Sequence, residues 1–354
     1  MNLSTLRSKV VFAVTAVAII VSLGSAGHAQ AQSAAANPLQ GLREFLSSSI
    51  DVQRRHHRQL MAAPQVVGTA VGLTEDGKPA IKVYTKSAAL AGIPATLDGV
   101  TVEVEETGEF HAIAAKNTFT SARTRVRVNP AVLFTRPVPI GVSTGNAGEC
   151  SAGTIGARVK DSSGNVYALS NNHVYALENS AALNSQVLQP GLFDTNCSFN
   201  PGNVIGTLSN FVPLNFSGND NTIDAAIAAS DIFQLGKSTP SNGYGTPRSA
   251  TVSAFVGQKV KKYGRTTSLT SGQVIGINAI VMVGYGSGTA QFTDQIVVSG
   301  RKFILAGDSG SLLVTSTGNN PVGLLYAGSS NGRTAIANRI DLVLNALGVT
   351  IDGN

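Results

Sequence analysis

Apolar positions divide the first third of the chain into segments of different periodicity. In residues 37–61 they recur three or four positions apart, which predicts an amphipathic helix. Residues 65–86 form two runs rich in Val, Ile and Thr that flank turn residues at 75–78, a pattern typical of a β-hairpin. A short alanine-rich helix and a strand over residues 99–108 are predicted next. We therefore interpret residues 37–115 as a small α+β N-terminal domain.

The pattern changes in the rest of the chain. Residues 116–135 are rich in Arg and Pro and predict a linker that is also accessible to processing. From residue 136 to residue 354 the apolar runs are short and β-like, with Gly, Asn and Ser between them. Such a succession of strands without long helices predicts a β-sandwich or a barrel. Only residues 340–349, at the end, have helical periodicity.

The first residues have the pattern of a secretory signal. Arg7 and Lys9 precede a short apolar run, and small residues follow up to Ala31. We therefore predict a signal peptide over residues 1–31 and a protein secreted to the periplasm or the extracellular medium. An uncleaved membrane anchor is the alternative, which the short run and the processing site disfavour. No later run approaches the roughly 18 apolar residues of a membrane span, so no membrane association is expected after cleavage.

Composition supports a secreted, turn-rich β protein. Only 13% of the residues are charged, 38 are Gly and none is Trp. The formal net charge is +6, and loss of Arg7 and Lys9 with the signal would lower it to +4. So small an excess of positive charge gives no reason to expect a nucleic acid partner.

Cysteine and histidine are scarce after the N-terminal domain. The chain has two cysteines, Cys150 and Cys197, and an even number in an exported protein favours one disulfide. Two free buried thiols are the alternative. With a single histidine in residues 136–354, a closed zinc site lacks ligands, so neither a metal nor a cofactor is expected. A calcium ion bound in a loop needs only oxygen ligands and stays open.

Three polar residues stand out in the C-terminal region. His173 is its only histidine and follows a hydrophobic run, whereas Asp224 lies within small and apolar residues, which predicts a buried carboxylate in need of a partner. Ser309 lies among turn residues in the segment 307–310, Gly-Asp-Ser-Gly. A serine hydroxyl becomes a nucleophile when a base takes its proton and an acid orients that base. The structural alternatives are a hydrogen-bonded histidine, an acid in a turn and a tight turn around the serine.

The order of these residues excludes one class of hydrolase. An α/β-hydrolase has its residues in the order Ser, acid, His and carries a glycine two positions after the serine. Here Ser311 occupies that position and no histidine follows Ser309. The observed order is His, Asp, Ser.

Four segments carry a resemblance to a known family. Asn-Asn-His-Val, Asp-Ala-Ala-Ile, Gly-Arg-Thr-Thr and Gly-Asp-Ser-Gly occur in that order, and this combination resembles the chymotrypsin-like (trypsin-fold) serine peptidases. The third segment looks like the bacterial α-lytic and streptogrisin-type branch. The overall layout is also similar to bacterial trypsin-like peptidases related to plant NARROW LEAF 1 proteins. The resemblance implies a mainly β fold, a double six-stranded β-barrel over residues 136–354, preceded by the α+β domain.

The resemblance also implies a role for each matched residue. Ser309 would attack the peptide carbonyl, His173 would transfer its proton, and Asp224 would orient His173. The backbone N–H groups of Gly307 and Ser309 would form the oxyanion hole. The chain is thus expected to be a secreted serine endopeptidase that acts on polypeptides through an acyl-enzyme. The alternative is a catalytically silent or latent trypsin-fold protein that serves as a binding scaffold.

Asp308 and Arg265 are expected to support this site. In animal trypsins the acid at the position of Asp308 pairs with a freed N-terminus, but no Ile-Val-Gly-Gly-like start precedes this region. In the α-lytic branch an arginine of the Gly-Arg-Thr-Thr segment takes that place. We therefore predict an ion pair between Arg265 and Asp308 that braces the oxyanion loop.

The substrate pocket is expected to be small and apolar. Phe303 stands six residues before Ser309, where trypsin-like specificity would require an acid, so cleavage after Lys or Arg is disfavoured. The resemblance makes Tyr326, Ala327 and Gly328 the strand along which substrate pairs. For the N-terminal domain two roles stay open: an inhibitor in cis that is removed at the linker, or a retained interaction domain.

Overall fold

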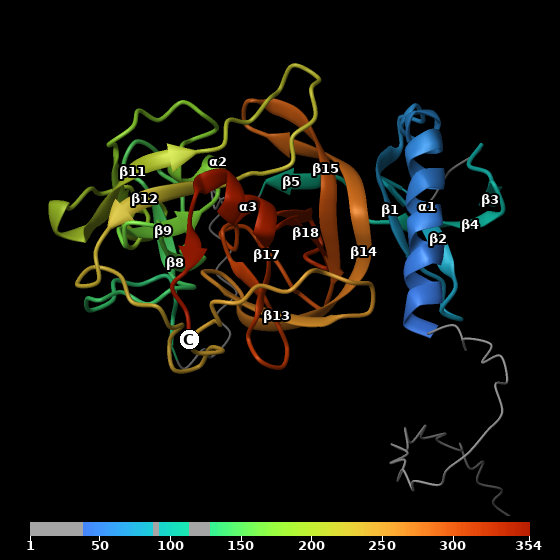
Figure 1. Cartoon of the computed structure of the whole chain (residues 1–354). Coiled ribbons are helices and arrows are strands. Elements are labelled where there is room, and N and C mark those ends of the chain that lie inside the picture. The colour runs from blue at the N-terminus through green and yellow to red at the C-terminus, as the bar shows by residue number, and fades with distance from the viewer. Residues whose placement is uncertain (1–37, 88–91, 113–127) are drawn as a thin grey trace, which may run out of the picture. The chain divides into compact units, whose positions relative to one another are not determined.

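The computed structural model describes residues 38–87, 92–112 and 128–354 (Figure 1). The chain divides into two units, Met1–Gly41 and Leu42–Asn354. Of the first unit only residues 38–41, the start of helix α1, are described. The predicted signal peptide, the centre of the alanine-rich segment and most of the predicted linker lie outside the described residues. Among the helices that are described, none combines the length and the hydrophobicity needed to cross a membrane.

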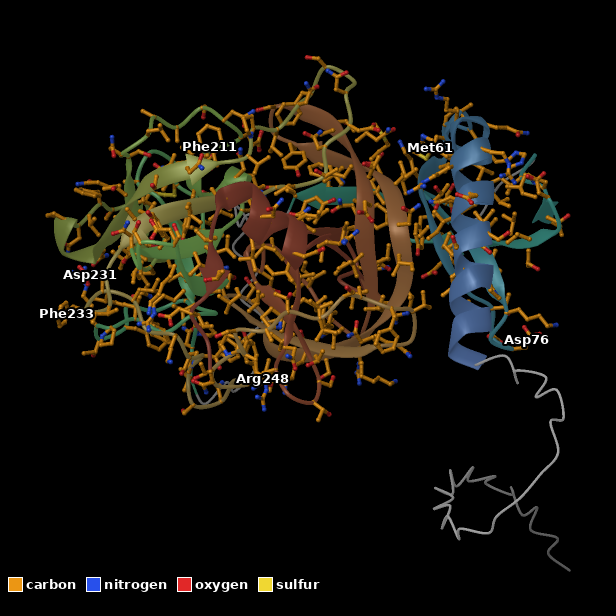
Figure 2. All side chains as sticks on the ribbon, viewed as in Figure 1. Met61, Asp76, Phe211, Asp231, Phe233 and Arg248 are labelled. Carbon is orange, nitrogen blue, oxygen red and sulfur yellow. A yellow bond between two sulfur atoms is a disulfide. The ribbon has the colours of Figure 1, made fainter. Side chains whose placement is uncertain are left out.

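The predicted N-terminal helix and hairpin are both present. Helix α1 (Pro38–Met61) packs Val52 and Leu60 against the hairpin formed by β1 (Val66–Leu73) and β2 (Pro79–Thr85). The two strands pair antiparallel, as expected of two β-rich runs joined by a short turn. The turn between them carries Asp76, which Figure 2 labels; its carboxylate accepts a hydrogen bond of 2.6 Å from the hydroxyl of Thr74. Short-range sequence signals therefore account for this part of the fold.

The larger sheet contains a closed barrel, called here the second barrel. Its strands are hydrogen-bonded in the order β13-β16-β17-β18-β15-β14, and β13 also pairs with β14, which closes the ring. Buried aliphatic side chains and Phe303 fill its interior. The strands are β13 (Lys259–Gly264), β14 (Ser268–Tyr285), β15 (Gly288–Ser299), β16 (Leu312–Thr315), β17 (Pro321–Ser329) and β18 (Thr334–Arg339).

The sheet of the second barrel continues into the N-terminal strands. β1 pairs antiparallel with β14, with Gly68 opposite Val281. The glycine permits this approach, because a Cβ at Gly68 would lie 2.8 Å from Cγ1 of Val281. Beyond β1 the order continues β2-β4-β3, and β5 pairs with both β14 and β17. These last strands are β3 (Thr96–Leu97), β4 (Val100–Glu106) and β5 (Phe110–Ala112).

The other sheet, called here the first barrel, curls around a separate core. Its eight strands have the order β19-β8-β9-β12-β11-β10-β6-β7 and are mostly green to yellow in Figure 1. Buried Ile, Val, Leu and Ala side chains fill its interior. The strands are β6 (Ser143–Asn146), β7 (Gly153–Thr154), β8 (Ala157–Lys160), β9 (Val166–Ser170), β10 (Gln186–Leu188), β11 (Val204–Phe211), β12 (Ala226–Ser230) and β19 (Thr350–Ile351).

Helices are short within the two barrels. α2 (Asn172–Tyr175) is a single turn, α3 (Ile340–Leu347) is the helix predicted at the C-terminus, and two 3₁₀ turns, η1 (Leu192–Thr195) and η2 (Pro201–Asn203), lie in the first barrel. The apolar side of α3 packs into a core shared by both barrels. The expected mainly β fold of two barrels after a small N-terminal helix and strand region is confirmed.

The predicted disulfide is also confirmed. Cys150 and Cys197 are bonded with their Cα atoms 5.2 Å apart, and the 47-residue loop between them contains His173.

Replacing both cysteines by serine is expected to lower the free energy of unfolding by about 2–4 kcal/mol, because the unfolded chain regains the freedom of that loop. Urea unfolding measures the change, with wild type in reducing buffer as the control. Equal stability of the double variant and the oxidised wild type would contradict the prediction.

Candidate active site

His173 lies in α2, directly after strand β9 of the first barrel. The single helical turn is held by side-chain amides rather than by its own length. The Asn171 amide donates to the Asp224 carbonyl oxygen (2.7 Å), and the Asn172 amide donates to the carbonyl oxygen of Val212 (2.8 Å). Because one helical turn is unstable alone, these bonds determine where the imidazole lies. His173 is 2% exposed.

Asp224 is the fully buried partner of this histidine. Its Oδ2 lies 2.6 Å from Nδ1 of His173, and its Oδ1 accepts the His173 backbone N–H at 3.3 Å. The backbone N–H of Asp224 donates to Oδ1 of Asn338 on β18 at 3.0 Å, so the second barrel helps to hold the acid. With Nδ1 engaged, Nε2 is the nitrogen left for chemistry. It is buried and has no hydrogen-bond partner within the part of the chain that the structure describes.

Ser309 lies in a turn that only glycines permit. Gly307 and Gly310 have φ values of +97° and +90°, and a Cβ at Gly310 would lie 2.3 Å from both the Ser170 hydroxyl and the Thr154 carbonyl oxygen. The turn thus presses against the first barrel. The hydroxyl of Ser309 donates to the carbonyl oxygen of Tyr326 at 3.2 Å, and the residue is fully buried.

The serine turn and the histidine helix meet at Gly153. A Cβ on Gly153 would lie 2.5 Å from Cγ2 of Val174 in α2 and 3.1 Å from the carbonyl oxygen of Ser309. The next residue, Thr154, donates its N–H to that same oxygen at 2.7 Å. Three residues far apart in sequence, His173, Asp224 and Ser309, are therefore carried by elements in direct contact.

Asp308 has a different partner from the predicted one. Its carboxylate forms an ion pair with Lys262 on β13, with Nζ 3.1 Å from Oδ2, and both side chains are fully buried. Oδ1 accepts the N–H groups of Thr266 (2.9 Å) and Thr267 (3.1 Å), and Oδ2 accepts the Leu305 N–H at 3.0 Å. Burial lowers the pKa of Lys262, and the neighbouring carboxylate opposes that shift.

Arg265 forms an ion pair with Asp194 instead of Asp308, so the predicted Arg265–Asp308 ion pair is wrong. The guanidinium forms a bidentate contact with Asp194, with Nε 3.0 Å from Oδ2, and lies over the Phe193 ring. Asp194 belongs to η1, close to the disulfide. Arg265 therefore ties the second barrel to the first. The physical reason is direction: Lys262 lies on the buried face of β13 with Val260, whereas Arg265 follows the end of the strand.

The residues expected to contact substrate have separate locations. Tyr326, Ala327 and Gly328 lie together on β17, and Ser309 contacts the first of them. Phe303 is fully buried in the core of the second barrel, where a Cβ on Gly272 would touch its ring at 3.1 Å. Its side chain therefore packs inside the barrel core, which does not fit the substrate-pocket role predicted for it.

Strand β5 occupies the edge of β17 next to Ser309. It pairs antiparallel with β17, with His111 opposite Gly328 and Ala112 opposite Ala327. On its other side it runs parallel to β14, with His111 opposite Gly284. The last residue of β5, Ala112, thus lies opposite the residue that follows Tyr326. The carbonyl oxygen of Tyr326 accepts the hydrogen bond from the Ser309 hydroxyl.

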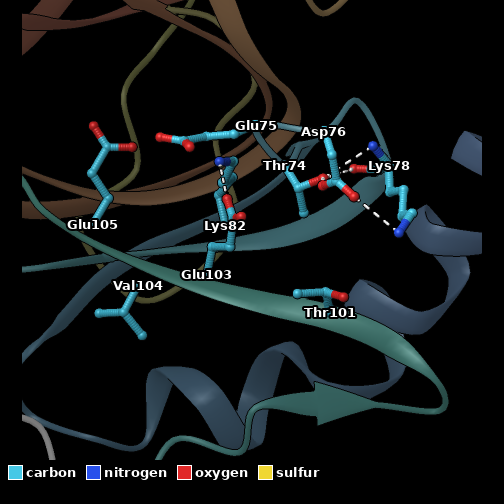
Figure 3. A pocket seen from close by; sticks show the side chains of 9 residues that line it. All are labelled: Thr74, Glu75, Asp76, Lys78, Lys82, Thr101, Glu103, Val104 and Glu105. Carbon is cyan, nitrogen blue, oxygen red and sulfur yellow. Dashed lines mark hydrogen bonds and ion pairs between the residues drawn. The ribbon is translucent and has the colours of Figure 1, made fainter.

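Two open cavities lie away from these residues. One, of about 700 Å³, is lined by side chains of β2, β4 and the turn at Asp76, including the ion pair Lys82–Glu103 (Figure 3). The other, of about 830 Å³, is lined by residues of α1 such as Arg54 and by the segment 218–220. Neither contains His173, Asp224 or Ser309. These three residues are themselves buried, with exposed fractions of 2%, 0% and 0%.

Comparison with known proteins identifies the family. Serine protease 2 of Streptomyces fradiae is 31% identical over 188 residues, which cover 53% of this chain and 91% of that protein. The chain belongs to the bacterial trypsin-like serine peptidases, and it is a serine endopeptidase. Streptogrisin-A of Streptomyces griseus is 39% identical over 101 residues, 28% of this peptidase and 32% of that protein. Residues 191–349 of the peptidase match the Nal1 C-terminal domain family.

Solved structures with similar folds were also found. A glutamic acid-specific serine protease has a TM-score of 0.44 and 24% identity, covering 60% of the peptidase and all of that chain. The chymotrypsin of Cellulomonas bogoriensis has a TM-score of 0.43 and 22% identity, covering 61% and 99% of the two chains.

Sequence reasoning missed three residues of the candidate site. They are Lys262, Asn338 and Tyr285, whose hydroxyl donates to Oδ2 of Asp224 at 2.9 Å. The sequence contained an indication for Lys262, because side chains two positions apart in a strand lie on the same face and Val260 is buried. It contained none for Asn338 and Tyr285, because their contacts cross from the second barrel to the first.

Proposed function

We propose that the peptidase cleaves peptide bonds with Ser309 as nucleophile, His173 as base and Asp224 as the acid that orients it. The buried contact of 2.6 Å between Nδ1 and Oδ2 supports this assignment, because it fixes the tautomer that leaves Nε2 as acceptor. As Ser309 Oγ attacks the substrate carbonyl carbon, its proton passes to Nε2. The imidazolium that forms is stabilised by the adjacent Asp224 carboxylate.

The reaction then proceeds through an acyl-enzyme. The tetrahedral intermediate collapses when Nε2 donates its proton to the leaving amine, which leaves an ester on Ser309. Water attacks the carbonyl carbon of that ester and gives a proton to the same nitrogen. The bond between the acyl carbon and Ser309 Oγ then breaks, Nε2 returns the proton to Oγ, and the carboxylic acid product departs. The N–H groups of Gly307 and Ser309 would bind the oxyanion, and each such donor contributes about 10²–10³-fold in turnover. The satisfied Asp308 carboxylate supports this role by ordering the loop that carries both N–H groups.

The experiment that tests this assignment is phosphonylation of Ser309. A fluorophosphonate is added to the processed, secreted protein, and the modified peptide is identified by mass spectrometry. Label on Ser309 in wild type and none in Ser309→Ala is the expected result. Absence of label in processed wild type would contradict the proposal and favour the binding-scaffold alternative.

We further propose that β5 keeps the site latent in the unprocessed chain. Substrate peptides bind enzymes of this kind by adding a strand to an exposed sheet edge, and β5 already occupies that edge at Ala327 and Gly328. The complete burial of Ser309 supports the same idea. The Ser309 hydroxyl donates to the Tyr326 carbonyl oxygen rather than to His173 Nε2, so it must rotate before catalysis.

Maturation of a secreted precursor would relieve this block. The disulfide supports an oxidising destination, in agreement with the predicted signal peptide. Intact mass of the secreted protein tests the proposal directly. A chain that starts within residues 124–142 would support removal of the N-terminal segment at the linker, whereas a chain that starts near Gln32 would contradict it.

A further inference from the structure

Tyr285 is a polar residue in contact with the candidate catalytic pair that sequence reasoning did not assign. It is the last residue of β14, at the tip of the β14–β15 hairpin of the second barrel. Its hydroxyl donates to Oδ2 of Asp224 at 2.9 Å, the same oxygen that lies 2.6 Å from His173 Nδ1. Two donors therefore share one carboxylate oxygen, one from each barrel.

The aromatic ring of Tyr285 also touches the pair. It lies edge to face with the imidazole of His173, with the ring centroids 5.9 Å apart. Phe216 contacts it edge to face at 5.6 Å and Phe292 stacks on it at 6.1 Å. Aromatic neighbours in these geometries restrict the ring, so the direction of the hydroxyl is determined by packing.

The hairpin tip that carries Tyr285 is anchored to the first barrel. The carboxylate of Glu178 accepts the N–H groups of Gly286 at 3.1 Å and Ser287 at 2.7 Å. Glu178 follows α2, the helix that carries His173. The hairpin is therefore bound on both sides of the pair, through Asp224 and through Glu178.

Another tyrosine next to the pair does not make this contact. Burial and the charge of Asp224 raise the pKa of Tyr326 well above its ordinary value, but its hydroxyl has no hydrogen-bond partner among the described residues. Burial, Asp224 and Glu178 raise the pKa of Tyr285 in the same direction. Tyr285 thus keeps its proton at neutral pH and remains a donor to the carboxylate.

We propose that Tyr285 is a positioning residue, which holds Asp224 Oδ2 in the plane that directs His173 toward Ser309. This proposal rests on the function proposed above, since it concerns the same histidine and acid. The hydrogen bond that the structure shows for this hydroxyl goes to Asp224. It acts only through Asp224, and its removal should alter turnover rather than substrate binding.

Tyr285→Phe tests the proposal, because it keeps the ring and removes the hydroxyl. Tyr167→Phe is the matched control, since its hydroxyl donates to Asp161 at 3.0 Å, outside the site. In the processed enzyme, kcat is expected to fall about tenfold in Tyr285→Phe, the scale of one hydrogen bond to a charged group, with KM unchanged. Tyr167→Phe should match wild type in both constants.

A spectroscopic measurement separates this proposal from the proposed function. In the full chain, the low-field NMR resonance of the His173 Nδ1 proton, assigned by its loss in His173→Gln, reports the bond to Asp224. In Tyr285→Phe it should move to lower field, because Oδ2 then has one donor instead of two, while Tyr167→Phe leaves it in place. Unchanged resonance and kcat, or a higher KM with unchanged kcat, would overturn the positioning role.

The two proposals fail in different ways. If Ser309 is not labelled in any form of the protein but the resonance still moves in Tyr285→Phe, the peptidase assignment fails and the contact between Tyr285 and the pair stands. If Ser309 is labelled and both readouts of Tyr285→Phe equal wild type, only the positioning proposal fails. A thermal unfolding midpoint equal to that of Tyr167→Phe verifies that the variant is folded.

Discussion

Lys262→Met is expected to lower kcat of the processed peptidase about 10²–10³-fold, the scale of one lost oxyanion donor. The substitution removes the cation 3.1 Å from Asp308 and leaves a fully buried carboxylate without its ion-pair partner. Breaking a buried pair in this way costs about 3–5 kcal/mol of stability. The loop that carries Asp308 and Ser309 lies next to that charge, so its backbone geometry should change first.

A neighbouring lysine provides the matched control. Lys261 lies on the other face of β13, and its ammonium group donates to the carbonyl oxygen of Ser316 at 2.9 Å. Lys261→Met should keep kcat within about twofold of wild type, because a partly exposed contact of this kind contributes little. Peptide hydrolysis and urea unfolding are measured on both variants. Equal behaviour of Lys262→Met and Lys261→Met would refute the bracing role of the buried pair.

A double variant keeps the test informative if Lys262→Met unfolds. Adding Asp308→Asn removes the unpaired negative charge, so the double variant should be more stable than Lys262→Met alone. The amide cannot accept all the N–H groups that Asp308 now accepts, and kcat should stay low. A double variant no more stable than the single one would show that the charge is not the cause of the loss.

His111→Pro in the unprocessed chain is expected to raise kcat/KM for a short peptide about 10²-fold. Proline removes one N–H from β5 and cannot donate to the ladder, and we expect a cost of about 3 kcal/mol, the scale known for proline inside a hydrogen-bonded helix. That free energy corresponds to roughly a hundredfold larger fraction of chains with a free β17 edge. The activated chain should therefore resemble the processed enzyme.

His111→Ala separates this backbone effect from loss of the side chain. The imidazole of His111 is exposed, and alanine keeps the backbone pairing with Gly328 and Gly284. Its kcat/KM should equal that of the unprocessed wild type. Intact mass after the assay verifies that each chain is still full length. An unprocessed His111→Pro chain as inactive as His111→Ala would rule out β5 as the inhibitory element.

Much of the fold could be predicted because its signals are local. The helical spacing in residues 37–61, the hairpin turn and the apolar repeat before Gly348 each act within one element, and each was found. The alternation of short strands also indicated the β class. The barrel itself required the resemblance, since strand order depends on pairings between residues that are far apart in the chain.

The candidate site likewise contains residues that the sequence indicated and a partner that it did not. His173, Asp224 and Ser309 were found from residue type, order and the predicted burial of the acid, and the structure brings their elements together. The partner of Asp308 was not found, because Lys262 and Arg265 are three residues apart and both are cations. Only the direction of each side chain at the end of β13 decides between them.

The sequence by itself determined the β class, the disulfide and the residues proposed for acyl transfer, because these follow from periodicity, cysteine number and chemical type. The tertiary structure decided three further points. It paired Lys262 with Asp308, placed Tyr285 on Asp224 across 61 positions, and laid β5 on the edge of β17. Each depends on the register and twist of strands from different parts of the chain, which no local pattern encodes.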